Sequence, residues 1–219
     1  MEERSTNQLE SGGSIPTSPL QTSIVKRIIY QEAKPFVEKH HYTHSIGIVE
    51  CACGLFFNNL LVGVITFAHV SGRTTAKSIL SDSTSKEVWE LRRMVLLDSC
   101  PTNSESFFIC RAVKIVKEHN SELRLLVAFA DCNVGHTGHV YKASGWKEWG
   151  KTSPEWHYTT KDNVYVNKYI VWRRAKSFGK KEREQATLEG LTYHKDKPKN
   201  RFIRIIRNCN NRLVIKDKL

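Results

Sequence analysis

The segment ADCNVGHTGHVYKASGW, residues 130–146, concentrates side chains that can do chemistry. Asp131 directly follows the apolar run LRLLVAFA, and His136, His139 and Tyr141 lie within ten residues of it. Open α/β sheets place their sites at the carboxyl ends of parallel strands, so a carboxylate here can accept a proton or bind a metal. Asp is also common as the cap of a turn, and the spacing alone does not separate these roles.

A second cluster, HHYTH, follows a helical pattern earlier in the chain. His41 in this cluster is suited to act as a base or a ligand, or to cap the carbonyls at a helix end. Tyr141 is suited to donate a proton to a leaving group, to stack on a base, or to fill the core. A divalent metal ion is a further expectation, with iron first and zinc second, because His and carboxylate donors form such sites. The candidate ligands are His41, Asp131, His136 and His139, although the H-x-x-H spacing is also frequent by chance.

The elements that must position these residues follow from hydrophobic periodicity and turn signals. Strands are predicted at 23–30, 88–98, 123–131, 146–152, 167–174 and 201–206, and helices at 31–41, 104–120 and 137–144. A hairpin of CACGLFF and LLVGVITFA turns at Asn58 and Asn59, which tolerate left-handed backbone. A strand followed by a helix and another strand implies a parallel crossover, whereas the hairpin is antiparallel. The sequence therefore predicts an α/β fold, a central mixed sheet with helices on both faces.

Length and composition divide the 219 residues into three predicted parts. These are a disordered lead at 1–22, a catalytic domain at 23–175, and a basic C-terminal extension with a late strand at 176–219. No run of about 18 apolar residues occurs, so no membrane partner is expected, and the polar start is not a signal peptide. The six cysteines form no C-x-x-C pair, which favours reduced thiols in a cytoplasm. The oligomeric state stays open, with a homodimer as one option.

The positive charge is concentrated near the end of the chain. Of the formal net charge of +12, residues 171–219 contribute +10, from 15 Lys and Arg against 5 Asp and Glu. Such a segment favours a polyanion partner such as a nucleic acid, through release of counterions from phosphates. The alternative is a solvated edge strand whose lysines discourage aggregation. The candidate phosphate contacts are Lys195, Lys197, Lys199, Arg201, Arg204 and Arg207.

The order of elements resembles the GNAT acyltransferase fold, and the phrase VYKASGWKEWG strengthens the likeness. In that superfamily a tyrosine on a short helix protonates the departing thiolate of coenzyme A, and Tyr141 occupies that place. GNAT enzymes bind the coenzyme's pyrophosphate on glycine-rich backbone at the start of the long helix. Here that junction reads LLDSCPTNSESFF, which has no glycine, and Pro101 removes one backbone donor. Acetyl-CoA thus stays open as the donor, although the glycine-rich loop that usually binds its pyrophosphate is absent from this junction.

A narrower family shares this departure. The chain resembles the bacteriophage Mom DNA-modification proteins, which have a GNAT-like core. The matching pieces are HHYTHS, WELRRMVLLD, NSESFF, ADCNVGHTGHVYKASGW and KPKNRFIRII, in the family's order. The resemblance implies an enzyme that converts adenine in phage DNA to an N6-carbamoylmethyl form in the host bacterial cytoplasm, which protects that DNA from host restriction. The donor of the glycine-derived unit is not evident from the sequence.

The resemblance also implies roles for individual residues. It pairs His41 and Tyr42 with the family's His-Tyr pair, and Arg93 with the arginine of its E-L-x-R strand. Asp131 and Tyr141 match the family's Asp and Tyr. A serine that opens the long helix corresponds to Ser104 or Ser106, so cofactor binding is expected at Ser104, Glu105 and Ser106. Because Arg92 replaces a usually milder residue, the arginine that faces the cleft is left undecided between Arg92 and Arg93.

The chemistry expected from these residues is nucleophilic substitution. Adenine N6 is a poor nucleophile, so its attack needs a base for the proton and a donor or cation for the developing charge. Asp131 is the expected base, Tyr42 is suited to stack on an extruded adenine, and Arg93 is suited to bind a phosphate or carboxylate. Two other hypotheses stay open: an N-acetyltransferase that uses acetyl-CoA on a protein or small amine, and a non-catalytic DNA-binding module.

Overall fold

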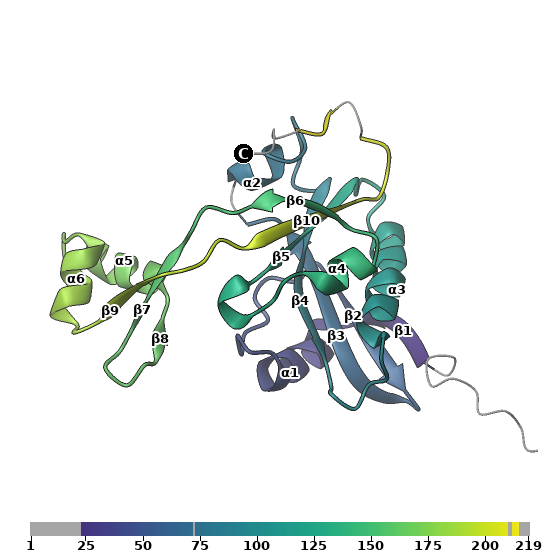
Figure 1. Ribbon diagram of the computed structural model, residues 1–219, viewed down its shortest axis with the longest axis horizontal. Helices are drawn as coiled ribbons and strands as arrows, with labels where there is room; N and C mark the ends of the chain where they lie inside the picture. Colours follow the sequence, from purple (N-terminus) through teal and green to yellow (C-terminus); the bar gives the residue numbers. More distant parts are fainter. Residues whose placement is uncertain (1–22, 72, 210–211, 215–219) are drawn as a thin grey trace, which may run out of the picture.

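The computed structural model describes residues 23–71, 73–209 and 212–214 of the chain. The predicted lead at 1–22 lies outside the described residues. The main domain contains β1 (Ser23–Ile28), α1 (Tyr30–His40), β2 (Cys51–Phe57), β3 (Leu60–His69), α2 (Arg73–Lys77), β4 (Val88–Leu96), α3 (Ser104–His119), β5 (Leu125–Ala130), the 3-10 helix η2 (Cys132–Val134), α4 (His139–Ala143), β6 (Lys147–Lys151) and β10 (Asn200–Ile205). Its strands form a seven-stranded sheet in the order β1-β2-β3-β4-β5-β10-β6 among the described residues (Figure 1).

The main sheet is mixed, as predicted. Its pairs are antiparallel apart from β4 and β5, which run parallel. The parallel ladder joins Val88–Leu91 only to Leu125–Ala128. Beyond Leu91, β4 continues along β3, and beyond Ala128, β5 continues along β10. The two strands therefore separate at their carboxyl ends, and this opens the sheet where Asp131 follows β5.

Helices cover both faces of this sheet, which confirms the predicted fold class. Along β5, Leu126 and Ala128 belong to the core cluster that contains α3 and α4. Leu125 and Val127 point to the other face, where a cluster with the segment after α2 lies. This alternation is the two-residue period of a strand buried on both sides. The helix α1 packs on that second face as well, against β2 and β3.

The long helix α3 forms where its apolar positions repeat with helical spacing. Phe108, Ala112 and Val116 recur every four residues, and each is fully buried. Ile109 and Val113 fill the neighbouring row of the same face. Burial of a large apolar side chain stabilises a fold by roughly 1.5 to 3 kcal/mol, so this face fixes α3 firmly on the sheet. The hairpin turn is also as predicted, since Asn58 and Asn59 both have positive φ angles.

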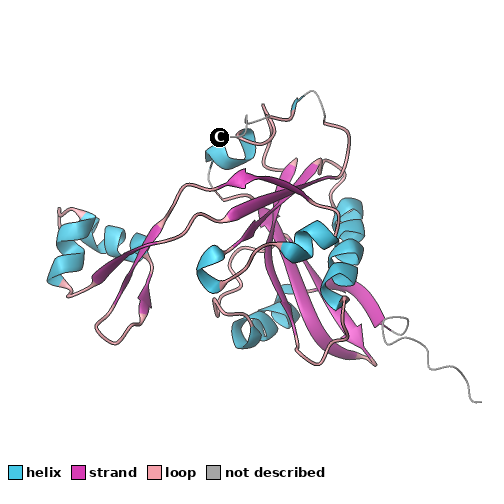
Figure 2. Ribbon diagram, in the orientation of Figure 1, coloured by secondary structure: helices cyan, strands magenta, loops and turns pink. Residues whose placement is uncertain are grey.

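The segment of the chain between β6 and β10 forms a second, smaller lobe (Figure 1 and Figure 2). It contains β7 (Trp156–Thr159), β8 (Tyr165–Val166), α5 (Lys168–Ser177), α6 (Glu182–Leu188) and β9 (Thr192–Lys195). Its three strands form a separate sheet in the order β8-β7-β9. A small core of Tyr158, Val171 and Ala186 joins this sheet to the two helices.

The predicted strand at 167–174 is wrong, because the segment NKYIVWRR forms most of α5. Its β-branched and aromatic residues are typical of a strand. However, the side chain of Asn167 accepts a hydrogen bond from the Tyr169 backbone N–H and caps a helix. Val171 and Ala175, four residues apart, then form the buried face. The predicted division after residue 175 falls within this helix.

The late strand predicted at 201–206 exists as β10, and it lies inside the main sheet between β5 and β6. The chain thus leaves the main sheet after β6, builds the lobe, and returns through β10 (Figure 1). Both connections reach the lobe from the edge where β4 and β5 separate. None of the helices that the structure describes is long and apolar enough to cross a bilayer.

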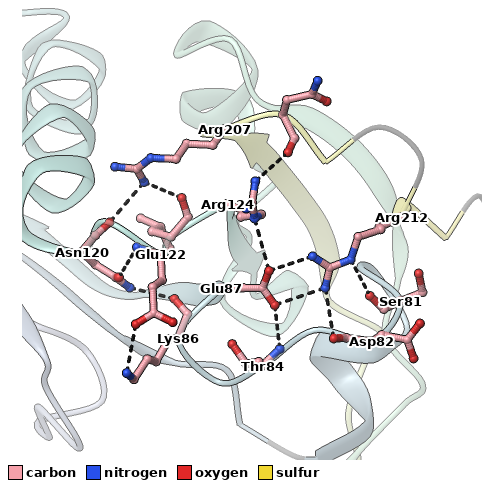
Figure 3. A network of polar contacts seen from close by, with 12 residues as sticks. Ser81, Asp82, Thr84, Lys86, Glu87, Asn120, Glu122, Arg124, Arg207 and Arg212 are labelled. Atoms are coloured by element: carbon pink, nitrogen blue, oxygen red, sulfur yellow. Dashed lines mark hydrogen bonds and ion pairs between the residues drawn. The ribbon is translucent and has the colours of Figure 1, made fainter.

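A polar network ties the segment after β10 to the start of β4 (Figure 3). Arg212 donates two hydrogen bonds to the Glu87 carboxylate, at 2.8 and 3.2 Å. Arg124 donates to the same carboxylate at 3.2 Å, and the Thr84 backbone N–H does so at 2.9 Å. These donors hold the pKa of Glu87 at about 2, with the Arg212 hydrogen bonds the largest cause.

We expect Glu87→Gln to lower the free energy of unfolding at pH 7 by roughly 1 to 2 kcal/mol, since it removes charged hydrogen bonds. The pKa of Glu87 is lowered from 4.5 to about 2, so the stabilisation is present above pH 4.5 and is lost as the pH falls toward 2. Urea unfolding of both proteins across this range measures it. The control is Glu122→Gln, which removes a surface ion pair with Lys86 worth at most about 1 kcal/mol. Equal effects of the two substitutions would contradict the role of Glu87.

Candidate active site

A cleft of about 1230 Å³ lies where β4 and β5 separate, and the lobe contributes to its lining. From β4 it is lined by Glu90 through Met94, and from the end of β5 by Phe129 through Asp131. The loop that leads into α4 forms another part of the lining. The lobe and its connections add Lys151, Thr152, Ser153, Pro154, Glu155, Tyr165, Asn167, Lys168 and Lys199. Two separate sheets therefore build one cavity.

Most of the residues predicted to act in catalysis line this single cleft. They are His41, Tyr42, Arg93, Asp131 and Tyr141, and His136 and His139 line it with them. They come from the end of α1, from β4, from the residue after β5 and from α4. His41 and Asp131 lie ninety residues apart in the sequence. In the structure they line the same cleft, where β4 and β5 separate.

A bulge in β4 gives Arg92 and Arg93 different surroundings. Thr66 of β3 pairs with Arg93, but the next residue, Phe67, pairs with Leu91, so Arg92 is an extra residue. A bulge of this kind re-aims the side chains around it. Both arginines reach the cleft as a result, but they contact different groups.

Arg92 is held by groups at the wall of the cleft. Its guanidinium donates to the Ser71 hydroxyl at 2.7 Å and to the His69 carbonyl at 3.0 Å, and it lies 3.4 Å from the Glu90 carboxylate. Arg93 donates instead to the Ser45 carbonyl at 2.8 Å. Burial lowers the pKa of Arg93. Its charge lowers the pKa of both His41 and Tyr42, so Arg93 is the arginine that lies with these two side chains.

His41 is a buried imidazole with a defined hydrogen bond. The Thr43 backbone N–H donates to its Nδ1 at 3.1 Å, so in the neutral ring the proton is assigned to Nε2. Burial, followed by the charges of Arg93, His136 and His44, lowers the pKa of His41 to about 4. At neutral pH His41 is therefore uncharged, and its Nε2–H is a hydrogen-bond donor.

Tyr42 lies between two imidazole rings. It stacks on His41 with ring centroids 4.4 Å apart and meets the edge of His136 at 5.6 Å. Its side chain is 48% exposed, which leaves part of the ring open to a ligand. Burial raises the pKa of Tyr42, and the nearby Asp131 carboxylate raises it further. The phenol is therefore protonated at neutral pH and lies near Asp131.

The two oxygens of the Asp131 carboxylate have different partners. Its Oδ1 accepts hydrogen bonds from the backbone N–H and the side-chain amide of Asn133, both at 3.0 Å, which caps η2. Its Oδ2 lies 3.8 Å from the Lys199 ammonium group. The cap fixes the direction of the carboxylate, and its second oxygen is the one that faces Lys199 in the lining of the cleft.

Tyr141 is buried, with 8% of its surface exposed. Its ring packs against Trp146 and Phe202, with centroids 5.5 and 5.4 Å away. Burial strongly raises the pKa of Tyr141, and the neighbouring Tyr42 and Glu90 raise it further. A phenol in this setting is a proton donor rather than a base at neutral pH.

The serines at the start of α3 do not line the cleft, whereas Glu105 does. The hydroxyl of Ser104 is buried and donates to the Pro101 carbonyl at 2.6 Å. The hydroxyl of Ser106 donates to the Asn103 carbonyl at 3.1 Å. Both hydroxyls complete the turn that begins the helix, so the structure does not place them with Asp131 and Tyr141.

The basic residues predicted to contact phosphate fall into two groups. Arg201 is 5% exposed and donates to the Trp149 carbonyl. Arg204 donates to the Ser144 carbonyl at the end of α4, and Arg207 to carbonyls at the end of α3. These three guanidinium groups donate to internal backbone carbonyls, and Arg201 also lines the cleft. The other group is Lys195, Lys197 and Lys199, of which the first two are exposed and the third lines the cleft.

No group of three or more His, Cys, Asp or Glu side chains in the described part of the chain is arranged to hold a metal ion. The predicted ligands His41, Asp131, His136 and His139 all belong to that part. They line the same cleft but do not form a metal-binding group. The Nδ1 of His41 and the Oδ1 of Asp131 are instead engaged by Thr43 and Asn133.

Sequence reasoning missed Glu90 as a residue of the cleft. It lies three positions before Arg93 on β4, and its side chain is 15% exposed. Burial raises the pKa of Glu90, and the charge of Arg92 opposes this shift. A glutamate between the buried residues Trp89 and Leu91 of a strand was a signal that this face of β4 meets a cavity. The contributions of Lys168 and Tyr165 carried no such signal, because they depend on the fold of the lobe.

Together, these features define an α/β protein with its candidate site where two parallel strands diverge. The Mom protein family matches residues 22–218, so the chain belongs to this family. A relative is the "Methylcarbamoylase mom" of Escherichia phage Mu, which is 28% identical over 113 residues. That match covers 51% of this chain and 47% of the relative, so it spans about half of either protein.

Solved structures of acetyltransferases are also similar to this chain. An N-acetyltransferase from Staphylococcus aureus Mu50 is 9% identical with a TM-score of 0.47, and covers 84% of this chain and 99% of that one. A spermidine/spermine N-acetyltransferase from Vibrio cholerae is also 9% identical with a TM-score of 0.47, and covers 89% and 99%. Values this low support no statement about activity.

We expect the imidazole of His41 to titrate with a midpoint near pH 4, because burial and the Arg93 charge oppose its protonation. Arg93→Met should raise this midpoint toward the ordinary value of 6.5 without reaching it, since the burial persists. NMR titration of the ring C–H resonances measures both values. Arg92→Met is the matched control and should leave the midpoint unchanged. A wild-type midpoint close to 6.5 would contradict the buried, neutral ring.

The loop between Asp131 and Tyr141 depends on two glycines with positive φ angles, +80° at Gly135 and +83° at Gly138. A Cβ at Gly138 would lie 2.1 Å from the Phe202 ring, whereas one at Gly135 would meet nothing within 4 Å. Both substitutions by Ala strain the backbone. We expect Gly138→Ala to cost roughly 1 to 3 kcal/mol more than Gly135→Ala, from the clash with Phe202. Urea unfolding measures the free energy of unfolding of both variants. Equal losses would show that the Phe202 ring moves aside without a measurable cost.

Proposed function

We propose that this protein is a transferase that attaches a carbamoylmethyl group to N6 of adenine in double-stranded DNA. On phage DNA this modification protects against host restriction. Membership of the Mom protein family supports the proposal, as does the printed name of the relative from phage Mu. The observation that carries it is the meeting of Asp131, Tyr42 and Tyr141 in one cleft large enough for a purine.

The chemistry that these residues support is substitution at a methylene carbon of the donor. The N6 nitrogen forms the new C–N bond while the bond to the leaving group breaks. The Oδ2 of Asp131 accepts the N6 proton, because its other oxygen is fixed by Asn133. Tyr141, protonated at neutral pH, donates its proton to the leaving group. The donor is a molecule that carries an activated glycinamide-like unit.

His41 and Arg93 supply the polar surroundings for this step. The Nε2–H of the neutral His41 ring is a donor for the amide oxygen of the transferred unit, and Arg93 offsets negative charge that develops on the donor. Preorganised donors of this kind are worth more in a partly buried cleft than in water. His41 is therefore assigned as a hydrogen-bond donor and not as the base.

Two features weigh against the use of acetyl-CoA in an ordinary acetyltransferase reaction. Pro101 removes a backbone donor just before α3. Glu105, in the first turn of that helix, places a carboxylate in the lining of the cleft. A carboxylate at this position repels a pyrophosphate and occupies the positive end of the helix dipole. The described structure gives no feature that favours a purely DNA-binding role.

The positive charge around the cleft suits a DNA substrate. Lys151, Lys168 and Lys199 line the cavity itself, and Lys195 and Lys197 lie on the strand and connection that lead to it. Modification of adenine N6 in a duplex requires extrusion of the base, which costs a few kcal/mol. Contacts between lysines and the flanking phosphates offset this cost.

The proposal is tested by expression of the protein in a bacterium, followed by mass spectrometry of nucleosides from plasmid DNA. We expect a deoxyadenosine heavier by one carbamoylmethyl group. Asp131→Asn should reduce this product by roughly a hundredfold or more, because it removes the base. Asp162→Asn, on an exposed turn of the lobe, is the control and should leave the yield unchanged. Only unmodified nucleosides from the wild-type protein, or full yield from Asp131→Asn, would refute the proposal.

A further inference from the structure

Three aromatic rings form a stack on one face of the lobe. His157 stacks on Tyr165 with ring centroids 4.9 Å apart, and on His194 with centroids 5.2 Å apart. The planes are inclined by 29° and 17°, so His157 is stacked with the ring on either strand beside it. Tyr165 is the outermost ring, and its side chain is 62% exposed. One face of Tyr165 is therefore covered by His157, while the ring stays largely open to solvent.

The lobe holds this stack in place by its sheet and by two polar contacts. On β7, Tyr158 faces the core with α5 and α6, so His157 and Thr159 face the other side. The ring of His157 is 2.8 Å from the Asp196 carboxylate, and that of His194 is 2.9 Å from the Thr159 hydroxyl. The two supporting rings are thus fixed before any ligand arrives.

The open ring of this stack belongs to the active-site cleft. Tyr165 lines the cleft together with Asp131 and Tyr42. Burial raises the pKa of Tyr165, and the carboxylates of Asp196, Glu155 and Asp131 raise it further. Because Asp131 also acts on Tyr42, the candidate base lies within electrostatic reach of two aromatic rings, one from the main domain and one from the lobe.

We propose that Tyr165, supported by His157 and His194, is the platform on which the extruded purine of the DNA substrate stacks. The inference rests on the proposed function and identifies a binding residue for it. A flat ring with a free face suits a nucleobase, since every base offers a π face to an aromatic side chain. The supporting rings keep Tyr165 in one orientation, so little conformational entropy is lost when the base arrives.

The charges beside Tyr165 fit the rest of a nucleotide. Lys168 and Lys199 line the same cleft. Lys168 is held over the Trp156 ring, 4.2 Å from its centroid, and Lys199 lies 3.8 Å from Asp131. An aromatic face and two ammonium groups in one cavity offer contacts for a base and for its flanking phosphates. The carboxylate that accepts the N6 proton lies in the same cavity.

The experiment compares binding of two single-stranded oligonucleotides of equal length to the full chain. One carries 2-aminopurine within an oligo-deoxyadenosine, and the other has an abasic site at the central position. The wild-type protein should prefer the base over the abasic site by roughly 5- to 100-fold, and the 2-aminopurine fluorescence should be quenched. Tyr165→Phe keeps the ring and should retain both properties, whereas Tyr165→Ala should lose both while it still binds the abasic strand.

Tyr169→Ala is the matched control, because Tyr169 is an exposed tyrosine of the same lobe that does not line the cleft. It should behave as the wild type does. Full preference in Tyr165→Ala, equal loss in Tyr169→Ala, or loss of the preference in Tyr165→Phe would overturn the platform. Circular dichroism of Tyr165→Ala checks that it is folded, and Tyr165→Phe carries the test if it is not.

Measurement of DNA modification in the same variants separates this inference from the proposed function. Asp131→Asn should lose modification but keep the preference for the base. If the wild-type protein prefers the base but modifies no adenine, the platform stands and the proposed reaction fails. If modification occurs at the wild-type level in Tyr165→Ala, the reaction stands and the platform fails.

Discussion

The separation of β4 from β5 is the constraint on which the rest of the structure depends. Two parallel strands can share hydrogen bonds only while they stay side by side, and here the ladder ends at Leu91 and Ala128. Beyond that point each strand keeps only its other neighbour, β3 for β4 and β10 for β5. The separation leaves a hollow directly at Asp131, which follows the last residue of β5.

The orientation of the side chains in this cleft follows from the separation of β4 and β5. The bulge at Arg92 turns two consecutive side chains of β4 toward the cavity, and the cap on η2 orients the Asp131 carboxylate. Burial then sets the protonation states. It lowers the pKa of His41 and raises the pKa of both Tyr42 and Tyr141, so at neutral pH these three side chains are uncharged and share the cleft with the Asp131 carboxylate. Such an arrangement suits transfer of a proton away from a weak nitrogen nucleophile.

The lobe adds what the main sheet lacks. Its own core is small, with Tyr158, Val171 and Ala186 at the centre, and many of its aromatic side chains are exposed. A lobe connected through β6 and β10 is anchored at the edge of the opening, on the side of Asp131. This explains why residues as distant as Lys168 and Lys199 reach the same cavity. The lobe thus adds aromatic and basic side chains, among them Tyr165 and Lys168, to the cleft beside the residues that the main sheet positions.

The sequence by itself determined the features that arise from short-range periodicity. The four-residue repeat of Phe108, Ala112 and Val116 required a helix, and the apolar run before Asp131 required a buried strand with a polar end. The order of these elements implied a mixed sheet, and the pieces of Mom-like sequence pointed to His41, Asp131 and Tyr141. All of this information is local, or depends on the order of segments along the chain.

Only the tertiary structure decided what each polar side chain contacts. The segment at 167–174 became a helix because Asn167 caps it and Val171 packs in the lobe, although its residues favour a strand. Arg201, Arg204 and Arg207 read as a basic surface, yet their guanidinium groups bind carbonyls up to ninety residues away. Lys199, which looks the same in sequence, reaches Asp131 instead. Contacts between distant segments determine which groups lie within reach of a long, flexible side chain. Composition does not encode those contacts.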